Sequence, residues 1–508
     1  MPTQDMFRVL NADCLARIYV EARQLRALRS LSMTCKSIRK SCMDILFERC
    51  HGYIVDDRLV HWPPPPTLWP HIQQLNYYGS VEDPVPELDW RAPETLPAER
   101  LARMLRAMPR LRGITVSNTR TGDGISWAIL QAILSTPQLR SFEVKGRMYR
   151  AYDRLRQTKL DFAPLESFRY HTFVYSKPPR IYSEEKELLS NILSKLSSTL
   201  VTLILPAECI SIDTLRGLDW PKLREIQFAG DGQGFCVPDA DLVSILGRVP
   251  RLRALSLDFA IADRSQVQAY WPARAQHAEF PWPELGSLAL TWVHPEENIF
   301  HHLPATCRRL SLRSWPRAYN HYRMRGNFLR DIRWRLRLLS PPVILEALQE
   351  CCDLPLEHLE LEYRASSDDI GLLAYVARTF TRLRTLRLIR YRPLKDNAPV
   401  PVKDVVEQFS VMQNLRVLEL YLDLENVTLQ QRRPQPYEEF CRELDAALTD
   451  IAPTLCSSLV SLCLITMDGD GPARWRYYRP VRVPGSSTSL VFDFVHHEID
   501  YLRARPSW

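Results

Sequence analysis

The sequence predicts an α/β protein in which a short all-α unit precedes an irregular solenoid of strand–helix repeats. Stretches with helical apolar spacing alternate with a short leucine pattern, L-x-x-L-x-L. A shuffled chain with 71 leucines in 508 residues would give this pattern about once or twice. Here it occurs seven times, beginning at Leu200, Leu252, Leu285, Leu356, Leu383, Leu415 and Leu459. Looser copies extend the array toward residue 70.

The predicted organisation has three parts: a helical unit at 1–50, a proline-rich spacer at 51–70 and the repeats at 71–508. Pro63 to Pro66 follow His61 and Trp62, which is typical of a stiff polyproline-type segment. Proline is also frequent just before a repeat, as at Pro250, where it ends a helix and favours an extended strand.

The first fifty residues predict three short amphipathic helices. A unit of this size forms only a small core, so we expect it to persist by docking on a partner. A simple helical cap on the solenoid is the alternative. The three shared faces are Leu15, Ile18 and Tyr19; Leu28 and Leu31; and Cys35, Ile38, Cys42 and Ile45.

Within each repeat, the last two leucines are two residues apart and therefore point to one face of a strand. One strand with one helix cannot bury its apolar side, whereas stacked repeats bury it continuously. Right-handed connections then place parallel strands on the concave face and helices outside. A concave strand face binds a partner more often than it forms a catalytic cleft. An ordinary multilayer α/β protein is the alternative fold.

Over about residues 70–470 the chain resembles leucine-rich-repeat proteins. Its ninth repeat position departs from the usual Asn or Cys, being Thr119, Ala260, Tyr391 and Asp423 in four copies. The N-terminal unit resembles an F-box through three stretches, although Asn11 stands where proline is usual. These stretches are Leu10 to Leu15 followed by Ile18-Tyr19, Leu28 to Lys36, and Leu46-Phe47.

The F-box resemblance implies a non-catalytic substrate receptor of an SCF-type ubiquitin ligase. The unit would dock a Skp-type adaptor and, through it, a cullin, while the repeats hold a protein substrate. A leucine-rich-repeat scaffold that is not linked to a ligase is the alternative function. The matching positions contain both the docking face and the small internal core, and the sequence does not divide them: Leu10, Leu15, Ile18, Tyr19, Leu28, Leu31, Ile38, Leu46 and Phe47.

Positive charge is concentrated between Arg308 and Arg337, with ten arginines and one acid in a chain of net charge +7. Basic residues interleaved with aromatic ones suit single-stranded nucleic acid or an acidic or phosphorylated peptide, and the peptide fits a receptor role better. A solvated face whose arginine stems cover apolar surface is the alternative. The candidate patch is Arg313, Arg317, Arg323, Arg325, Arg330 and Arg333.

Motifs for nucleotide binding, zinc proteolysis, serine hydrolysis and EF-hand calcium binding are missing from the sequence, so we expect no enzyme, cofactor or metal site. The 12 cysteines contain no C-x-x-C pair and are expected to be free thiols. Neither a secretory start nor a membrane-length apolar run is present. These features predict an intracellular protein, cytoplasmic or nuclear, without a membrane association.

Overall fold

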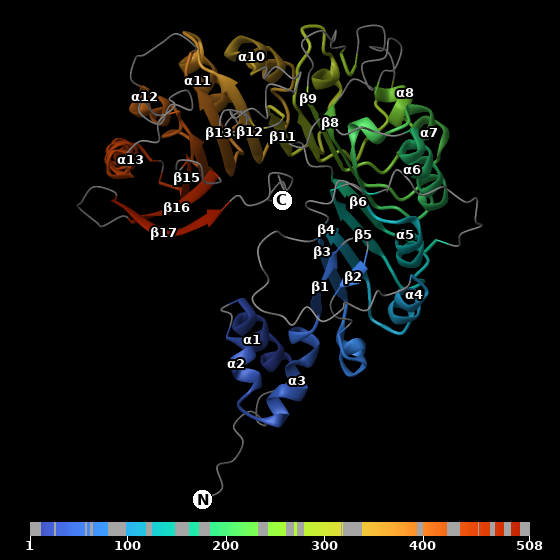
Figure 1. Cartoon of the computed structure of the whole chain (residues 1–508). Coiled ribbons are helices and arrows are strands. Elements are labelled where there is room, and N and C mark those ends of the chain that lie inside the picture. The colour runs from blue at the N-terminus through green and yellow to red at the C-terminus, as the bar shows by residue number, and fades with distance from the viewer. Residues whose placement is uncertain are drawn as a thin grey trace, which may run out of the picture. The chain divides into compact units, whose positions relative to one another are not determined.

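The computed structural model has a mixed α/β architecture with mostly parallel strands (Figure 1). The chain divides into two compact units, which are described separately. Unit 1 comprises Met1–Phe173 and Tyr182–Thr202, and unit 2 comprises Val174–Ile181 and Leu203–Trp508. The structure describes residues 12–24, 27–55, 58–60, 64–79, 98–117, 124–146, 148, 162–171, 183–231, 242–260, 269–271, 279–315, 317, 338–393, 400–423, 437–455, 457–467, 473–481 and 489–497.

Unit 1 begins with the helices α1 (Ala12–Gln24), α2 (Leu28–Ser32) and α3 (Lys36–Leu46). Their positions agree with the helical spacing of the sequence. The sulfur of Cys35 accepts the backbone N–H of Ile38 at 3.5 Å, which caps the start of α3.

The expected spacer at 51–70 is wrong in its described part, because most of it belongs to the sheet. The strand β1 (Arg49–Val55) pairs in parallel with β3 (Gln74–Gly79) and antiparallel with β2 (Arg58–Val60). A 3₁₀ helix, η2 (Pro66–His71), begins at the last residue of the proline run, and the indole of Trp69 donates to the Pro64 carbonyl at 2.6 Å. Pro64 to Pro66 therefore lead into one turn, whereas residues 49–55 and 58–60 form strands.

The remaining strands of unit 1 continue from β3 in parallel, each pairing with the next. Strands β5 and β6 alternate buried and half-buried residues, as expected for a strand with one side on the core. The elements are α4 (Ala98–Arg106), β4 (Gly113–Ser117), α5 (Trp127–Leu134), β5 (Ser141–Lys145), β6 (Ser167–His171) and α6 (Ser183–Leu196).

In unit 2, strands β8 to β15 run parallel and in register, and two antiparallel strands, β16 and β17, follow. Strand β7 (Thr202–Pro206) begins at the division between the units. The further strands are β8 (Glu225–Asp231), β9 (Ala254–Ala260), β10 (Ser287–Leu290), β11 (Arg309–Leu312), β12 (His358–Arg364), β13 (Thr385–Tyr391), β14 (Val417–Tyr421), β15 (Ser461–Met467), β16 (Ala473–Val481) and β17 (Ser489–His497).

Helices and 3₁₀ turns connect the parallel strands of unit 2. They are η3 (Ala207–Cys209), α7 (Ile212–Gly217), α8 (Leu242–Leu246), η6 (Ile299–His302), α10 (Pro341–Glu350), α11 (Asp369–Thr379), α12 (Val402–Glu407), α13 (Tyr437–Ile451) and η9 (Ala452–Thr454). Most of these connections are shorter than regular helices, which makes the solenoid irregular, as the sequence predicts.

A recurring backbone feature defines the repeats independently of side chains. Immediately before a strand, one carbonyl accepts two successive N–H groups of the next repeat; Arg224, for example, accepts from Arg253 and Ala254 at 2.7 and 2.9 Å. The same arrangement at Glu48, which accepts from Gln73 and Gln74, makes β1 the first repeat strand. The other accepting residues are Gln73, Arg112, Arg140 and Glu166 in unit 1, and Arg253, Gly286, Arg308, Glu357, Arg384 and Arg416 in unit 2.

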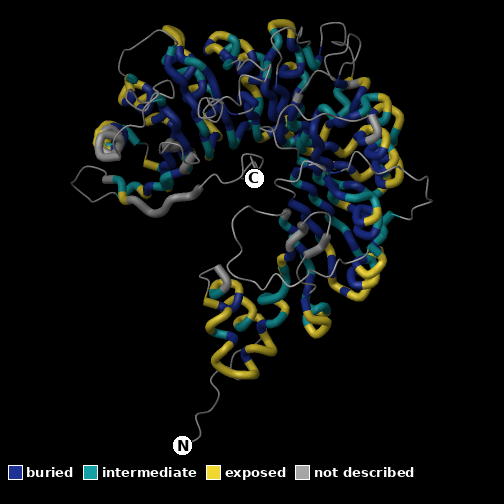
Figure 2. Tube along the Cα trace, viewed as in Figure 1, coloured by how far each residue is buried: buried dark blue, intermediate teal, exposed yellow. Residues whose placement is uncertain are grey.

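In all seven leucine patterns the first leucine lies two residues before a strand and the other two lie on it, and all of these leucines are buried. Figure 2 shows burial concentrated along the strands, with exposed residues on helices and turns. Two repeats share a buried tryptophan three residues before the first leucine: the indoles of Trp220 and Trp282 donate to the backbone carbonyls of Leu215 and Leu246. These side chains satisfy helix-end carbonyls in place of regular helix caps.

Buried tyrosine–carboxylate pairs join strands to the following helices. Tyr170 donates to Glu185 at 2.6 Å, at the start of α6, and Tyr363 donates to Asp369 at 2.5 Å, at the start of α11. In both cases the tyrosine is the last core-facing residue of its strand. Such pairs fix the turns of a solenoid whose ninth repeat position lacks a regular amide.

Candidate functional site

The structure divides the predicted adaptor-binding residues between a core and a surface. Tyr19, Leu28 and Ile38 are buried with Cys42 in the internal core of the helical unit. Leu15, Leu31 and Leu46 are partly buried and pack against this core, and Phe47 is half-buried. Ile18 is 40% exposed. Leu10 lies outside the described residues.

The exposed apolar residues of the helical unit include two that sequence reasoning missed. Val20 is 45% exposed and Met33 is 64% exposed, alongside Ile18. Both belong to the short unit, but neither lies on the apolar faces that define its helices in the sequence. Large exposed side chains of this kind are candidates for contact with a partner.

Polar contacts fasten the helical unit to the first repeats of unit 1. The Asp44 carboxylate on α3 lies 2.5 Å from Nδ1 of His71 and 2.9 Å from Nη1 of Arg110. Hydrogen bonds from these two side chains hold the pKa of Asp44 below its ordinary value. Together with the β1–β3 pairing, these contacts fix the helical unit against the repeats without an intervening spacer.

The polar strand face of unit 2 consists of the strand side chains that alternate with the buried leucines of β8 to β15, together with Arg313 and Arg317, which follow β11. At its centre, Arg313 donates to Asp258 through Nε and Nη2, both at 2.8 Å, and Nη1 lies 3.6 Å from Glu360. Arg317 contacts Glu360 at 2.5 Å and Glu362 at 2.8 Å.

Arg313 and Arg317 therefore do not belong to a surface patch for an acidic partner, contrary to the sequence expectation. They are only 2% and 5% exposed, and buried carboxylates of β9 and β12 pair with their guanidinium groups. Arg323, Arg325, Arg330 and Arg333 lie outside the described residues. Of the six candidate arginines, the structure describes Arg313 and Arg317, and these two lie neither in a binding patch nor on a solvated face.

The same ion network extends to the following strands. Arg387 on β13 pairs with Glu419 on β14, approaches Glu360 at 3.5 Å, and stacks over Trp475 with its guanidinium carbon 4.7 Å from the ring centre. Burial disfavours ionisation of Glu360, but Arg317, Arg387 and Arg313 together hold its pKa well below the ordinary value. The charges are thus compensated within the protein, and the network is a structural clasp across the strands.

Unit 1 has a smaller polar strand face. Gln74 donates to Asn76 at 3.1 Å and to Thr115 at 3.4 Å, and Thr115 donates to Glu143 at 3.2 Å. Glu143 also lies 3.6 Å from His171. Asn76, Thr115 and Glu143 occupy matched positions on β3, β4 and β5, and the contacts together make one line of polar side chains across the strands.

Sequence reasoning also missed a basic row at the edge of unit 2 where the strands begin. The leading row is defined as the residues directly before and after the first apolar position of each repeat from β8 to β15. Arg251 and Arg253 flank Leu252, and Arg382 and Arg384 flank Leu383. Repetition of arginine around that position is the signal that could have revealed the row.

Little in the described residues suggests catalytic or metal chemistry. No group of three or more His, Cys, Asp or Glu side chains in the described part could hold a metal ion. Burial raises the pKa of the Cys307 thiol to about 11 and that of Cys351 to about 12, so both stay protonated and unreactive near neutral pH.

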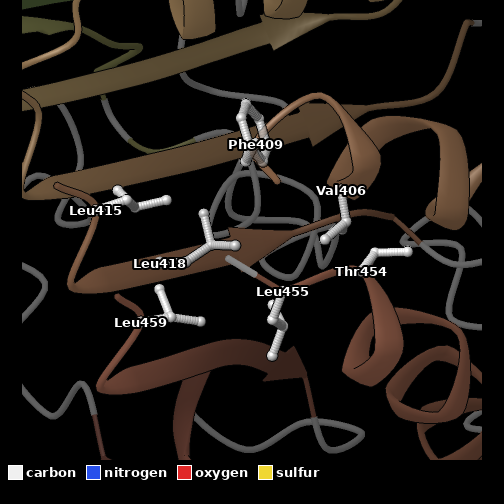
Figure 3. A pocket seen from close by; sticks show the side chains of 7 residues that line it. All are labelled: Val406, Phe409, Leu415, Leu418, Thr454, Leu455 and Leu459. Carbon is white, nitrogen blue, oxygen red and sulfur yellow. The ribbon is translucent and has the colours of Figure 1, made fainter. Parts of the chain in front are cut away.

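An apolar pocket lies among α12, β14 and η9 (Figure 3). The space does not admit a water molecule and offers almost no polar lining, so it is a packing gap of the core. Its walls are Val406, Phe409, Leu415, Leu418, Thr454, Leu455 and Leu459.

Among the residues that the structure describes, no helix is both long and apolar enough to cross a membrane.

No family model matches the chain, and no curated protein matches it. The crystal structure of TLR13 with ssRNA13 is similar with a TM-score of 0.30 and 12% identity, over 70% of this chain and 48% of that one. The chain therefore spans about half the length of TLR13. The leucine-rich-repeat-containing protein LegL7 of Legionella pneumophila gives a TM-score of 0.27 and 11% identity, over 83% and 92%. The repeat architecture of this chain rests on its own strand register and paired carbonyls.

Proposed function

We propose that this protein is the non-catalytic substrate-recognition subunit of an SCF-type ubiquitin ligase. Its helical unit docks a Skp-type adaptor and, through it, a cullin, while the repeats hold a protein substrate. This role is intracellular and needs no cofactor. The supporting observation is that the helical unit forms its own core and still exposes Ile18, Val20 and Met33. Exposed apolar residues on such a small unit favour a protein partner.

The docking role is tested with the exposed residues, because substitutions in the core would unfold the unit. Ile18→Asp combined with Met33→Asp is expected to weaken binding of the purified adaptor by at least about tenfold, since charged groups would replace an apolar contact. Lys40→Ala, at an exposed polar position of α3, is the matched control. Circular dichroism checks folding. Undiminished binding by the folded double variant contradicts the docking role.

A second measurement separates the ligase role from a repeat scaffold that recruits no ligase. The full chain is purified from cells and its partners are identified by mass spectrometry. Adaptor and cullin, lost together in the double variant, support the proposal. Other proteins without adaptor or cullin support the scaffold function, and partners that disappear on nuclease treatment indicate nucleic-acid binding.

A further inference from the structure

The leading row runs across the strands of unit 2, at the end where they begin, with regular spacing. Paired backbone hydrogen bonds align its members: the carbonyl of Arg224 accepts from the repeat of Arg253, and the carbonyl of Arg384 accepts from that of Arg416. Strands β8 to β15 are in register. Neighbouring members are therefore separated by about the 4.8 Å that separates hydrogen-bonded strands.

Most of the charge in this row is positive and exposed. Eight of its residues are basic and two are acidic, a surplus close to the net charge of +7 for the whole chain. All eight basic residues are exposed. The acidic members are Glu284 and Glu357, and the basic members are Lys222, Arg224, Arg251, Arg253, Arg308, Arg382, Arg384 and Arg416.

Several of these cations are not used inside the protein. In the described part of the chain, Arg224, Arg251, Arg382 and Arg416 have no carboxylate partner within 4.0 Å, in contrast to the compensated network on the polar strand face. Like charges along one edge repel each other, and a bound anion relieves that repulsion. These four arginines are therefore available to bind negatively charged groups of another molecule.

The chemistry of the row favours carboxylates. Seven of its eight basic residues are arginine, whose planar guanidinium matches a carboxylate with two parallel N–H groups. One contact within the row shows that its arginines bind carboxylates: Nε and Nη2 of Arg253 lie 2.9 and 2.8 Å from one oxygen of Glu284. The row contains no aromatic residue, so it lacks the stacking surface that single-stranded nucleic acid requires.

We propose that the leading row of unit 2 binds an acidic segment of a protein partner. This inference rests on the proposed receptor function and names the class of its substrate, an Asp- or Glu-rich stretch. The stretch would lie across the beginnings of the strands. It moves the acidic-partner site from Arg313 and Arg317, which are buried, to arginines that are exposed.

The test measures binding of a fluorescein-labelled decaglutamate peptide to the full chain by fluorescence anisotropy. The wild-type protein should bind with an affinity that falls steeply as salt rises. Reversing Arg224, Arg251 and Arg416 to Glu should weaken binding by at least about tenfold, because attractive contacts become repulsive. Reversing Arg378, Lys403 and Arg442, which are exposed on α11, α12 and α13, changes net charge equally and should leave binding within about twofold.

Three outcomes overturn the proposal: no binding of decaglutamate, equal loss in both triple variants, or tighter binding of a labelled decauridylate, which would assign the row to nucleic acid. Adaptor binding is measured on the same samples. Failed peptide binding with retained adaptor binding rejects only the proposed role of the leading row. Undiminished adaptor binding by the folded Ile18→Asp/Met33→Asp variant rejects only the docking role, and peptide binding is still measured on that variant. The two proposals therefore fail separately.

Discussion

Arg313, just after β11, reaches over the intervening strand β10 to form two hydrogen bonds of 2.8 Å with Asp258 on β9. Strand β10 places only the methyl group of Ala289 between the matched residues Ser256 and Ser311. The Nη2 group of Arg313 also donates to Ser256 at 3.0 Å. A buried ion pair thus clasps three successive repeats on the side opposite their leucine core.

Removing one partner of this pair should be costly. Arg313→Met leaves the fully buried carboxylate of Asp258 without its cation, so we expect a loss of about 3–5 kcal/mol in the free energy of unfolding. Urea denaturation followed by fluorescence measures the change. Combining Arg313→Met with Asp258→Leu should recover much of the loss, because no isolated charge remains buried. Equal destabilisation by the single and double variants would contradict the clasp.

Gly230 should not tolerate a side chain. Its φ of +127° is strained for other residues, and an added Cβ would lie 2.3 Å from a carboxylate oxygen of Glu208. We expect Gly230→Ala to lower the free energy of unfolding by about 1–3 kcal/mol. Gly217→Ala is the control, since nothing lies within 4 Å of the added atom. If thermal denaturation places both variants at the wild-type midpoint, the strain at Gly230 is absent.

Glu297 should make stability depend on pH. Burial raises its pKa from 4.5 to about 7, although the N–H groups of Tyr270, Trp271 and Ile299 oppose that shift. Between these pH values the unfolded chain ionises this carboxyl while the folded protein keeps it protonated. The contribution of Glu297 to the free energy of unfolding should therefore be greatest below pH 4.5. It should fall by up to about 3 kcal/mol as the pH rises to 7, and then stay constant.

Glu297→Gln isolates that contribution. All other ionisable groups are the same in the two proteins, so the difference between the two stability curves reports Glu297. We expect this difference to change between pH 4.5 and 7, as measured by urea denaturation at each pH, and to be constant above. A constant difference over the whole range would show that the Glu297 pKa is not raised.

The indole of Trp282 should stabilise its repeat through a hydrogen bond as well as through packing. Trp282→Phe leaves the buried carbonyl of Leu246 without its donor and opens a small cavity, at an expected cost of about 1–3 kcal/mol. Denaturant unfolding measures the cost. Half-buried Trp69, whose indole donates to Pro64, offers a comparison: Trp69→Phe should cost less, because water reaches this partly exposed position more readily than the core position of Trp282.

Periodic features of the sequence predicted much of the fold. Leucine spacing placed the strands of the seven strict repeats, and helical spacing placed α1 to α3. Strand β1 lacks the leucine pattern, and the run of prolines beside it suggested a spacer; only its pairing with β3 reveals a repeat. A spacing of residues carries no information on such pairing between distant segments.

Candidate sites were harder to predict because they depend on burial. Tyr19 and Ile18 are adjacent in the sequence, yet one is in the core and the other is exposed. Arg313 belongs to an arginine-rich stretch, but its partner Asp258 is 55 residues earlier. Charge density along the chain could not show that this arginine is neutralised, nor that separate arginines come together along one edge.

The pairing of β1 with β3 has a practical consequence for dividing this protein into parts. Cutting the chain after residue 70 removes the strand that covers β3, and cutting after residue 50, where the F-box-like pattern ends, takes away the first two residues of that strand and the Glu48 carbonyl before it. The shortened protein would present the bare hydrogen-bonding groups of β3 along its first edge, and such edges promote aggregation. A soluble repeat fragment should therefore begin before Glu48, whose carbonyl holds Gln73 and Gln74.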